Sequence, residues 1–351
     1  RLRVRIVERR TDYGRAEIVE ILAAGKGRRT PPCPRFGTCG GCDLQHLEDA
    51  LQADLKASAV RETLRRLGKV GSSVPTELVR GAAWAYRQRA QLHTIGRDED
   101  VQIGFFSRRG RQVVPVESCP VLVPERESVI PNHVEALPAA PPRRIDLLVG
   151  DDGALSSAPR VAGLPQREVS ITVGRYRYEL DARCFFQAHR ELRPRLVEEV
   201  VGPWRGRQAF DLYAGVGLFT LPLAERYEQV LAVEGDGVAG RFLKRNARRE
   251  RLERLDFEHS AVESWIDRLP AGADRVVVDP PRTGLSRRAS EQIARRRPSR
   301  LTYVSCHAAT LARDLKILSE SFEIEKITMF DLFPQTGHME TVAQLVLVGP
   351  P

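Results

Sequence analysis

The sequence predicts an α/β protein with a Rossmann-like domain in its C-terminal part and β-rich segments before it. A Gly-x-Gly turn at 215–217 follows an apolar run and precedes residues 219–226, which have helical spacing. After this turn, apolar runs alternate with helical patterns, as they do in a parallel sheet with crossover helices. Before it, apolar and charged residues alternate over 2–8 and 87–93, which predicts half-buried strands.

Composition sets the bounds on size and partners. A chain of 351 residues has room for two or three domains with cores of their own. The net charge is +9, and arginine clusters at 108–111 and 295–297 suit a polyanionic partner, although ordinary solvated surfaces also carry such clusters. No apolar run approaches the ~20 residues that a membrane-spanning helix needs. We therefore expect a cytoplasmic protein without a membrane segment.

Residues 1–29 are expected to form a first unit. The alternating patterns at 2–8 and 16–22 predict two strands joined by a turn at 12–14, and the Pro-rich stretch that follows predicts a linker. Two strands alone are marginally stable in water. We therefore interpret this segment as part of a small β-barrel.

A cysteine-rich loop opens the second unit, residues 30–180. Cys33, Cys39 and Cys42 lie close together among glycines, and Cys119 follows far downstream. Three thiolates from one run and one from a distant run are typical of iron–sulfur ligation. Zinc and unliganded thiols remain alternatives, because structural zinc usually takes two Cys or His pairs. A disulfide framework is disfavoured, because six cysteines in 351 residues do not resemble a small secreted scaffold.

The rest of the second unit is predicted to be β-rich, with one long helix. Residues 47–67 have helical spacing up to Gly68, and this helix is a candidate to pack on the third domain. Strands are predicted over 87–93, 102–106 and 169–180. We expect residues 135–165, which are rich in Pro, Ala and Gly, to form loops.

The third unit, residues 181–351, carries the Rossmann-like pattern. A dinucleotide fingerprint would need a third glycine at the position of Thr220, so the Gly-x-Gly turn argues against NAD. Glu234 ends the next predicted strand, where a carboxylate suits the hydroxyl pair of a ribose. A looser turn with acids at strand ends favours an unphosphorylated nucleoside ligand such as S-adenosylmethionine.

Reactive side chains follow the later strands. Asp279 begins a stiff Asp-Pro-Pro-Arg loop, and Cys306 ends the next predicted strand. Parallel neighbours deliver their last residues to one crevice, so we expect these two side chains to lie close together. A helix from about His307 would favour the thiolate of Cys306. The alternative is a buried structural thiol.

Glu340 stands directly before the last apolar strand. By itself it would be an ordinary solvated carboxylate. Together, a cysteine and a carboxylate suit methylation of a uracil at C5. A thiolate that adds to C6 makes C5 nucleophilic, and a base must then remove the C5 proton.

Six motifs in order resemble those of one family: Cys-x5-Cys-Gly-Gly-Cys at 33–42, Phe-Gln at 186–187, Asp-Leu-Tyr-x-Gly-x-Gly at 211–217, Asp-Pro-Pro-Arg-x-Gly at 279–284, Ser-Cys-x3-Thr-Leu-Ala-Arg-Asp-Leu at 305–315 and His-x-Glu-Thr at 338–341. The set looks like the RNA 5-methyluridine methyltransferases, especially the iron–sulfur members that act on 23S ribosomal RNA. The resemblance implies that Cys306 is the nucleophile and Glu340 the base.

The same resemblance implies the cofactors and the domain identities. S-adenosylmethionine would contact Gln187, Tyr213, Glu234 and Asp279, and a [4Fe–4S] cluster would be held by Cys33, Cys39, Cys42 and Cys119. The first unit would be part of a TRAM-type RNA-binding barrel, and the protein would act on ribosomal RNA as a monomer. Two alternatives remain. One is a transfer RNA uracil-C5 methyltransferase. The other is an inactive RNA-binding homologue, suggested by His307-Ala308 in place of the family's usual Asn-Pro.

Overall fold

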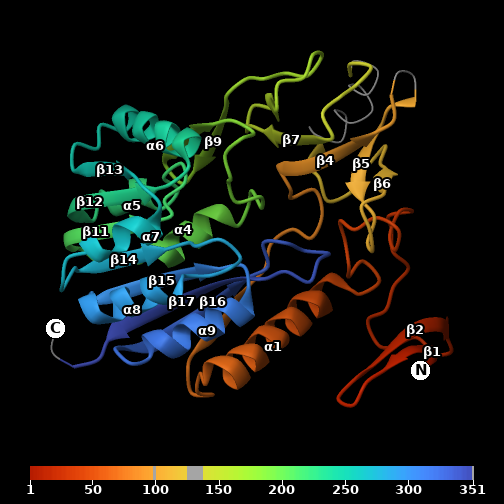
Figure 1. The fold of residues 1–351 in the computed structure, drawn as a ribbon, viewed down its shortest axis with the longest axis horizontal. Coiled ribbons are helices and arrows are strands. Elements are labelled where there is room, and N and C mark those ends of the chain that lie inside the picture. The colour runs from red at the N-terminus through yellow and green to blue at the C-terminus, as the bar shows by residue number, and fades with distance from the viewer. Residues whose placement is uncertain (98–99, 125–136, 350–351) are drawn as a thin grey trace.

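The computed structural model describes residues 1–97, 100–124 and 137–349. Its largest unit is an eight-stranded sheet with the order β13-β12-β11-β14-β15-β17-β16-β3 (Figure 1). The strands are β3 (Thr76–Val79), β11 (Gly206–Leu212), β12 (Tyr227–Glu234), β13 (Leu255–His259), β14 (Arg275–Val278), β15 (Arg300–Ser305), β16 (Phe322–Phe330) and β17 (Glu340–Leu347). Strands β11 to β15 run parallel, and β17 is antiparallel to both of its neighbours. The predicted α/β Rossmann-like fold is confirmed.

Helices cover both faces of this sheet. One face carries α4 (Arg193–Val201), α5 (Thr220–Leu223) and α6 (Gly237–Arg249). The other carries α1 (Asp49–Gly68), α7 (Val262–Trp265) followed by the short helix η2 (Ile266–Arg268), α8 (Arg287–Arg296) and α9 (Ala308–Leu318). Successive strand side chains point to opposite faces. Accordingly, Val277 of β14 packs in the first core, whereas Val276 and Val278 pack in the second.

Two expectations for this chain were wrong. The helix expected over 219–226 is reduced to the single turn α5, and residues 224–226 form a turn before β12 begins at Tyr227. Part of the expected loop at 135–165 is sheet: it contains β7 (Arg144–Val149) and β8 (Leu155–Ala158), with Ile145 and Leu147 buried. Residues 135 and 136 lie outside the described residues. The short apolar run of β7 is masked in the composition by its Pro- and Gly-rich flanks.

The central part of the chain forms a five-stranded antiparallel sheet with the order β6-β5-β4-β7-β8. Its remaining strands are β4 (Arg89–Ile95), β5 (Gln102–Phe106) and β6 (Val113–Pro115). A separate hairpin of β9 (Val169–Val173) and β10 (Tyr176–Leu180) lies against the large sheet. The Tyr178 hydroxyl donates to the Leu218 carbonyl at 3.0 Å. This bond ties the hairpin to the turn after β11.

Helix α1 and strand β3 belong spatially to the large sheet, although they precede β4 in the chain. α1 lies beside α9 (Figure 1), and its last residue, Gly68, is buried against Ala312. β3 pairs in parallel with β16 at the sheet edge. The expected contact of the 47–67 helix with the C-terminal layer is therefore seen. The boundaries 1–29, 30–180 and 181–351 themselves stay predictions.

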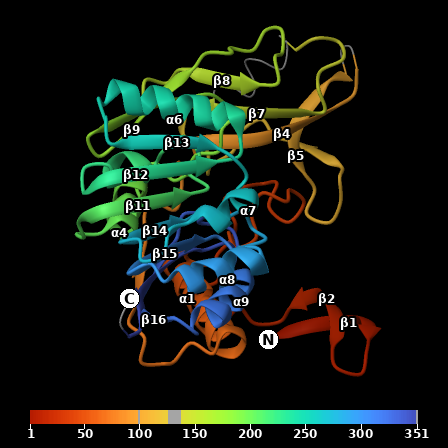
Figure 2. The ribbon, with the colours of Figure 1, turned by 60° about the vertical axis from the view of Figure 1, so that its left-hand side comes forward.

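Strands β1 (Leu2–Arg9) and β2 (Gly14–Ile21) form an antiparallel ribbon that projects from the rest of the molecule in both views (Figures 1 and 2). Among the described strands, these two pair only with each other. Apolar side chains on the ribbon are open to solvent, with Val4 48% and Ile18 61% exposed. The two predicted strands are confirmed, whereas the described residues form no barrel with them. None of the described helices has the length and apolarity needed to cross a bilayer.

Candidate active site

Four predicted site residues stand at the carboxyl ends of neighbouring parallel strands. Glu234 is the last residue of β12, and Tyr213, Asp279 and Cys306 directly follow β11, β14 and β15. β11 pairs in parallel with β12 and β14, and β14 pairs in parallel with β15, so the carboxyl ends of these strands lie side by side. The carboxyl edge of an open α/β sheet is where such folds bind ligands. The fold therefore brings the four residues to one edge.

Glu340 reaches the same edge from the opposite direction. β17 runs antiparallel to β15, and its Thr341 pairs with Ser305. The residue before Thr341 therefore lies beside the residue after Ser305. Glu340 is 2% exposed, and its charge acts directly on the Cys306 thiol. The predicted nucleophile and base are thus brought together.

The surroundings of Cys306 hold its proton in place. Burial and the neighbouring Glu340 carboxylate raise the pKa of the thiol to about 11, and the Arg282 guanidinium opposes them through its charge and a hydrogen bond. The helix expected after the thiol is confirmed: α9 begins at Ala308 with His307 as its N-cap. The pKa of the thiol is nevertheless raised, because burial and Glu340 outweigh Arg282; the contribution of the helix itself stays a prediction.

Three acids line the sheet edge and disfavour one another's ionisation. Burial raises the pKa of Asp211 to about 7, helped by Glu234. Burial and Asp211 raise the pKa of Asp279 to about 7. Burial and Asp279 raise the pKa of Glu340 well above its usual value. Carboxyl groups with raised pKa values in a cleft are typical of sites that bind or move protons.

The turn after β11 leaves its backbone accessible to a ligand. Tyr213 has a positive φ of 63° and donates its hydroxyl to Glu263 at 2.7 Å. The Glu234 carboxylate accepts from the backbone N–H of Gly215 at 2.8 Å and of Asp236 at 2.6 Å. Gly215 has a φ of 57°, and no heavy atom would lie within 4 Å of a Cβ placed there. A ligand can therefore approach this backbone closely.

Two buried acceptors near the sheet have no donor. Gln187, in the segment between β10 and α4, is 2% exposed, and its Oε1 has no hydrogen-bond partner among the described atoms. Oδ1 of Asp211, a fully buried residue, also lacks one, while the other carboxylate oxygen accepts from Thr220. Buried polar atoms without partners are uncommon, since leaving them unpaired costs free energy. Such atoms fit a ligand that brings donors of its own.

Comparison with known proteins decides the family. The family model described as tRNA (Uracil-5-)-methyltransferase matches residues 267–347. The 23S rRNA (uracil(1939)-C(5))-methyltransferase RlmD of Klebsiella pneumoniae subsp. pneumoniae is 31% identical, over 96% of this chain and 86% of that protein. The chain belongs to the RNA uracil-C5 methyltransferase family. The resemblance seen in the sequence is confirmed. The RlmD of Pectobacterium atrosepticum is likewise 31% identical, over 97% of this chain and 85% of that protein.

A solved structure supports the fold of this family member. The crystal structure of Pyrococcus abyssi tRNA (uracil-54, C5)-methyltransferase in complex with S-adenosyl-L-homocysteine superposes with a TM-score of 0.73. The alignment covers 97% of this chain and 92% of that chain, at 24% identity. At this identity the likeness shows the fold, which is an α/β methyltransferase fold.

A cavity of about 440 Å³ opens beside the predicted nucleophile of this methyltransferase. Cys306, His307 and His338 form one side, and Leu55 and Ala59 of α1 form another. Sequence reasoning missed this wall, because α1 is remote in the chain and shows no motif. It also gave no role to Arg282, although the Asp-Pro-Pro-Arg motif pointed to that loop.

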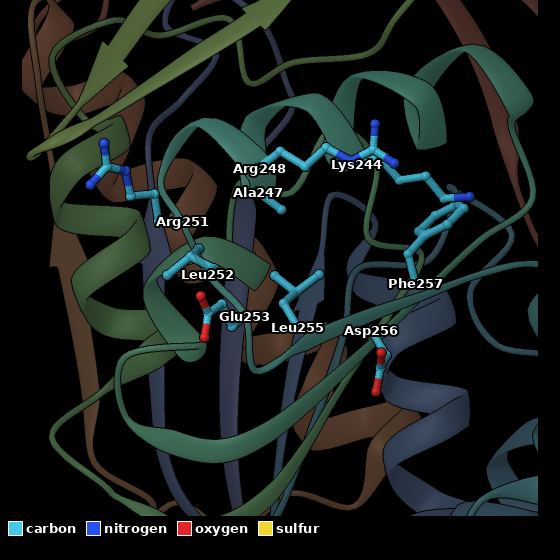
Figure 3. A pocket seen from close by; sticks show the side chains of 9 residues that line it. All are labelled: Lys244, Ala247, Arg248, Arg251, Leu252, Glu253, Leu255, Asp256 and Phe257. Atoms are coloured by element: carbon cyan, nitrogen blue, oxygen red, sulfur yellow. The ribbon is translucent and has the colours of Figure 1, made fainter.

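A second hollow, of about 490 Å³, lies between α6 and β13 (Figure 3). Its labelled side chains include Lys244, Arg248 and Arg251 around the apolar Leu252 and Leu255. None of the predicted catalytic or cofactor-binding residues lines it. The chemistry of this family member is therefore expected at the Cys306 cavity.

The four predicted cluster ligands lie near one another, but their arrangement in the described residues is not that of a metal site. All six cysteines are free thiols. Cys42 lies close enough to Cys39 and Cys119 for their charges to act on its thiol, and Cys39 is similarly affected by Cys33. In the described parts of the chain, no three His, Cys, Asp or Glu side chains are arranged to hold a metal ion.

Proposed function

We propose that this protein transfers the methyl group of S-adenosylmethionine to C5 of a uridine in 23S ribosomal RNA, through a covalent bond between Cys306 and C6 of the base. The convergence of Cys306, Glu340 and Arg282 at one sheet edge carries the proposal. The two relatives described above, each 31% identical to this chain and named as 23S rRNA uracil-C5 methyltransferases, favour the substrate.

The cofactor residues would be Gln187, Tyr213, Glu234 and Asp279. S-adenosylmethionine, when bound, supplies an electrophilic methyl group. The fit rests on the unpartnered Oε1 of Gln187 and on the open backbone at Gly215. Glu234 ends its strand where a carboxylate can accept from ribose hydroxyls. Tyr213 and Asp279 flank the same edge and would close around the remaining polar groups of the ligand.

The chain's own residues position each step. The Cys306 thiol must first lose its proton to solvent, and Arg282 stabilises the thiolate that remains. The thiolate adds to C6 of the uracil and pushes the ring electrons onto the O4 enolate. C5 would then take the methyl group, which would leave the cofactor sulfonium as a neutral thioether. Glu340, as a carboxylate with a raised pKa, accepts the C5 proton more readily than an ordinary carboxylate would. Loss of this proton restores the C5–C6 double bond and releases the thiolate.

The target base must leave its stack to reach the thiol, which costs a few kcal/mol. We propose that the β1–β2 ribbon, as part of a TRAM-type barrel, and the central β-rich unit bind RNA and offset this cost. Arginines of the loop at 108–111, which lines a hollow together with Gly37 and Thr38, support this. An rRNA-modifying role implies that the protein acts in the cytoplasm, and we expect it to act as a monomer.

We further propose that Cys33, Cys39, Cys42 and Cys119 hold a structural [4Fe–4S] cluster that takes no part in the methyl transfer. The donor set of four neighbouring thiols, with no carboxylate among them, supports the proposal. Anaerobic purification with iron and sulfide assays tests it: about four of each per chain is expected, following the composition of the cluster. One zinc without sulfide would contradict it.

The family model, described as a tRNA methyltransferase, favours transfer RNA as the second candidate substrate. Mapping of 5-methyluridine in 23S rRNA and tRNA from a strain that lacks the gene separates the candidates. We expect 5-methyluridine to be lost from 23S rRNA in this strain. The wild-type gene should restore it, whereas the gene carrying Cys306→Ala should not. Loss from tRNA alone would assign the second substrate, and no loss from either would indicate an inactive RNA-binding homologue.

A further inference from the structure

The segment between β16 and β17, residues 331–339, leads directly into Glu340; we call it the Glu340 loop. Three successive carbonyls of this loop, those of residues 333–335, accept hydrogen bonds from residues that precede the predicted catalytic domain at 181–351. Lys56 Nζ donates to the first at 3.1 Å, and the Tyr86 hydroxyl donates to the second at 3.0 Å. The backbone N–H groups of Asp43 and Leu44 donate to the third at 2.7 and 3.0 Å. The loop is therefore clamped by residues 43–86.

Gln335 is the centre of this clamp. It is fully buried and has a φ of 67°, a left-handed conformation that is unfavourable for a residue with a side chain. Its N–H donates to Gln52 Oε1 at 3.0 Å, and Gln52 Nε2 donates back to its Oε1 at 2.9 Å. Its Nε2 donates to Asp49 Oδ1 at 2.7 Å. The left-handed backbone is thus held by donors and acceptors from the first turn of α1.

The same helix forms a wall of the Cys306 cavity through Leu55 and Ala59. α1 therefore sets two things at once: one wall of the space beside the nucleophile, and the course of the loop that ends at the base. A buried polar network that is fully satisfied fixes one arrangement of the groups it connects. A small displacement of a catalytic group slows a reaction steeply, because the reacting atoms must be aligned.

We propose that Gln335 is a positioning residue, which fixes the Glu340 loop on α1 so that the Glu340 carboxylate meets the C5 proton. The inference rests on the proposed function and adds the residue that aligns its base. It makes removal of the C5 proton, rather than addition of Cys306 or binding of the cofactor, the step that depends on this network.

A charge exchange tests the proposal. Gln335→Glu replaces one donor to Asp49 with a carboxylate, so that two negative groups share the single Arg29 guanidinium that contacts both positions. We expect kcat to fall about 100-fold, as for a displaced catalytic group, with a nearly unchanged KM for S-adenosylmethionine. A Cys306–RNA adduct should accumulate on denaturing gels. Adding Asp49→Asn gives the pair of residues 49 and 335 one donor and one acceptor again. The double variant should therefore have a kcat at least tenfold higher than Gln335→Glu.

Three controls keep the outcome clear. Gln208→Glu makes the same chemical change at an exposed position at the start of β11, and should leave the rate unchanged. Tyr86→Phe removes one bond to the loop and should slow turnover a few-fold even if Gln335→Glu does not fold. RNA containing 5-fluorouridine should trap every folded variant that retains Cys306, because C5 then has no proton to lose.

The outcomes separate the two proposals. If Glu340→Gln itself accumulates no adduct, the role of the base in the proposed function fails. If Glu340→Gln accumulates adduct while Gln335→Glu turns over at the wild-type rate, the positioning role of Gln335 fails alone. It also fails if Gln335→Glu loses activity without adduct and Asp49→Asn does not restore it.

Discussion

Cys306 lies between opposing charges, and this balance governs its reactivity. Burial and Glu340 hold the proton on the thiol, whereas Arg282 favours the thiolate. The pKa of about 11 means that the resting enzyme carries little thiolate at neutral pH. A thiol that stays protonated is a weaker nucleophile than a thiolate.

Alkylation of Cys306 should follow this balance. Below pH 9 its rate should rise about tenfold per pH unit, because the thiolate is the nucleophile. Arg282→Ala removes the cation that favours the thiolate, so the midpoint of the curve of alkylation rate against pH should move to higher pH. Glu340→Gln removes the carboxylate that disfavours the thiolate, so the same midpoint should move to lower pH. Mass spectrometry of the Cys306 peptide after timed iodoacetamide treatment measures each rate, and a wild-type midpoint below pH 9 would contradict this account.

Glu340→Gln should separate the two halves of the reaction. The amide cannot accept the C5 proton, but addition of Cys306 and methylation at C5 do not need it. A covalent protein–RNA species carrying the methyl group should therefore accumulate, while turnover falls by at least about 100-fold. Labelled methyl groups on a denaturing gel measure both. A slow variant without the covalent species would show that another group removes the proton.

The location of these residues was predictable, and their electrostatics were not. A cysteine and an aspartate at the ends of neighbouring parallel strands must meet at one edge. Whether the thiol is charged depends on Glu340, which begins β17 far along the chain, and on how deeply both residues are buried. Their roles in catalysis stay predictions until the variants are measured.

For element α1, the sequence predicted the helix but not the hydrogen bonds that it makes. Its helical spacing was evident, but its partner was only a candidate, because helix pairing is decided by distant residues. Gln52 and Gln335 lie 283 positions apart and still share hydrogen bonds. The loop expected at 135–165 was wrong for a similar reason, because the pairing of β7 with the distant strand β4 decided the outcome.

The close approach of α1 to α9 depends on Gly68. A Cβ there would lie 3.1 Å from the Ala312 carbonyl oxygen and 3.2 Å from its Cα. Since backbone atoms cannot easily yield, Gly68→Val should destabilise the protein by about 1–3 kcal/mol through overpacking. Urea unfolding measures the change. Ser58→Val, at an exposed position of α1, is the control and should stay within about 0.5 kcal/mol; equal effects at both positions would contradict the packing argument.

At the scale of the whole molecule, the basic loop at 108–111 contacts both the projecting ribbon and the segment after Cys42. Arg109 pairs with Glu17 of β2 at 3.4 Å, and Arg108 pairs with Asp43 at 3.5 Å. Arg109 is 82% exposed in this pair. Exposed ion pairs of this kind are weak. Both guanidinium groups can therefore exchange these partners for RNA phosphates.

Arg108→Ala with Arg109→Ala should weaken RNA binding and reduce its salt dependence. Loss of two phosphate contacts should lower the slope of log K against log salt by about 1.4–1.8. Cofactor affinity should not change. Arg287→Ala with Arg295→Ala on α8 removes the same charge from arginines that pair with Glu291, and should leave the slope unchanged. If both double variants alter the slope equally, RNA binding depends on the net charge of the protein and not on phosphate contacts of Arg108 and Arg109.

Methyl transfer by Cys306→Ala tests the central claim most directly. The purified variant should bind S-adenosylmethionine as tightly as the wild type, because the thiol acts on the base and not on the cofactor. It should form no 5-methyluridine in 23S rRNA, whereas the wild-type protein should methylate C5 of a uridine in the same RNA. A variant that retains more than a few per cent of wild-type turnover would contradict covalent catalysis by Cys306.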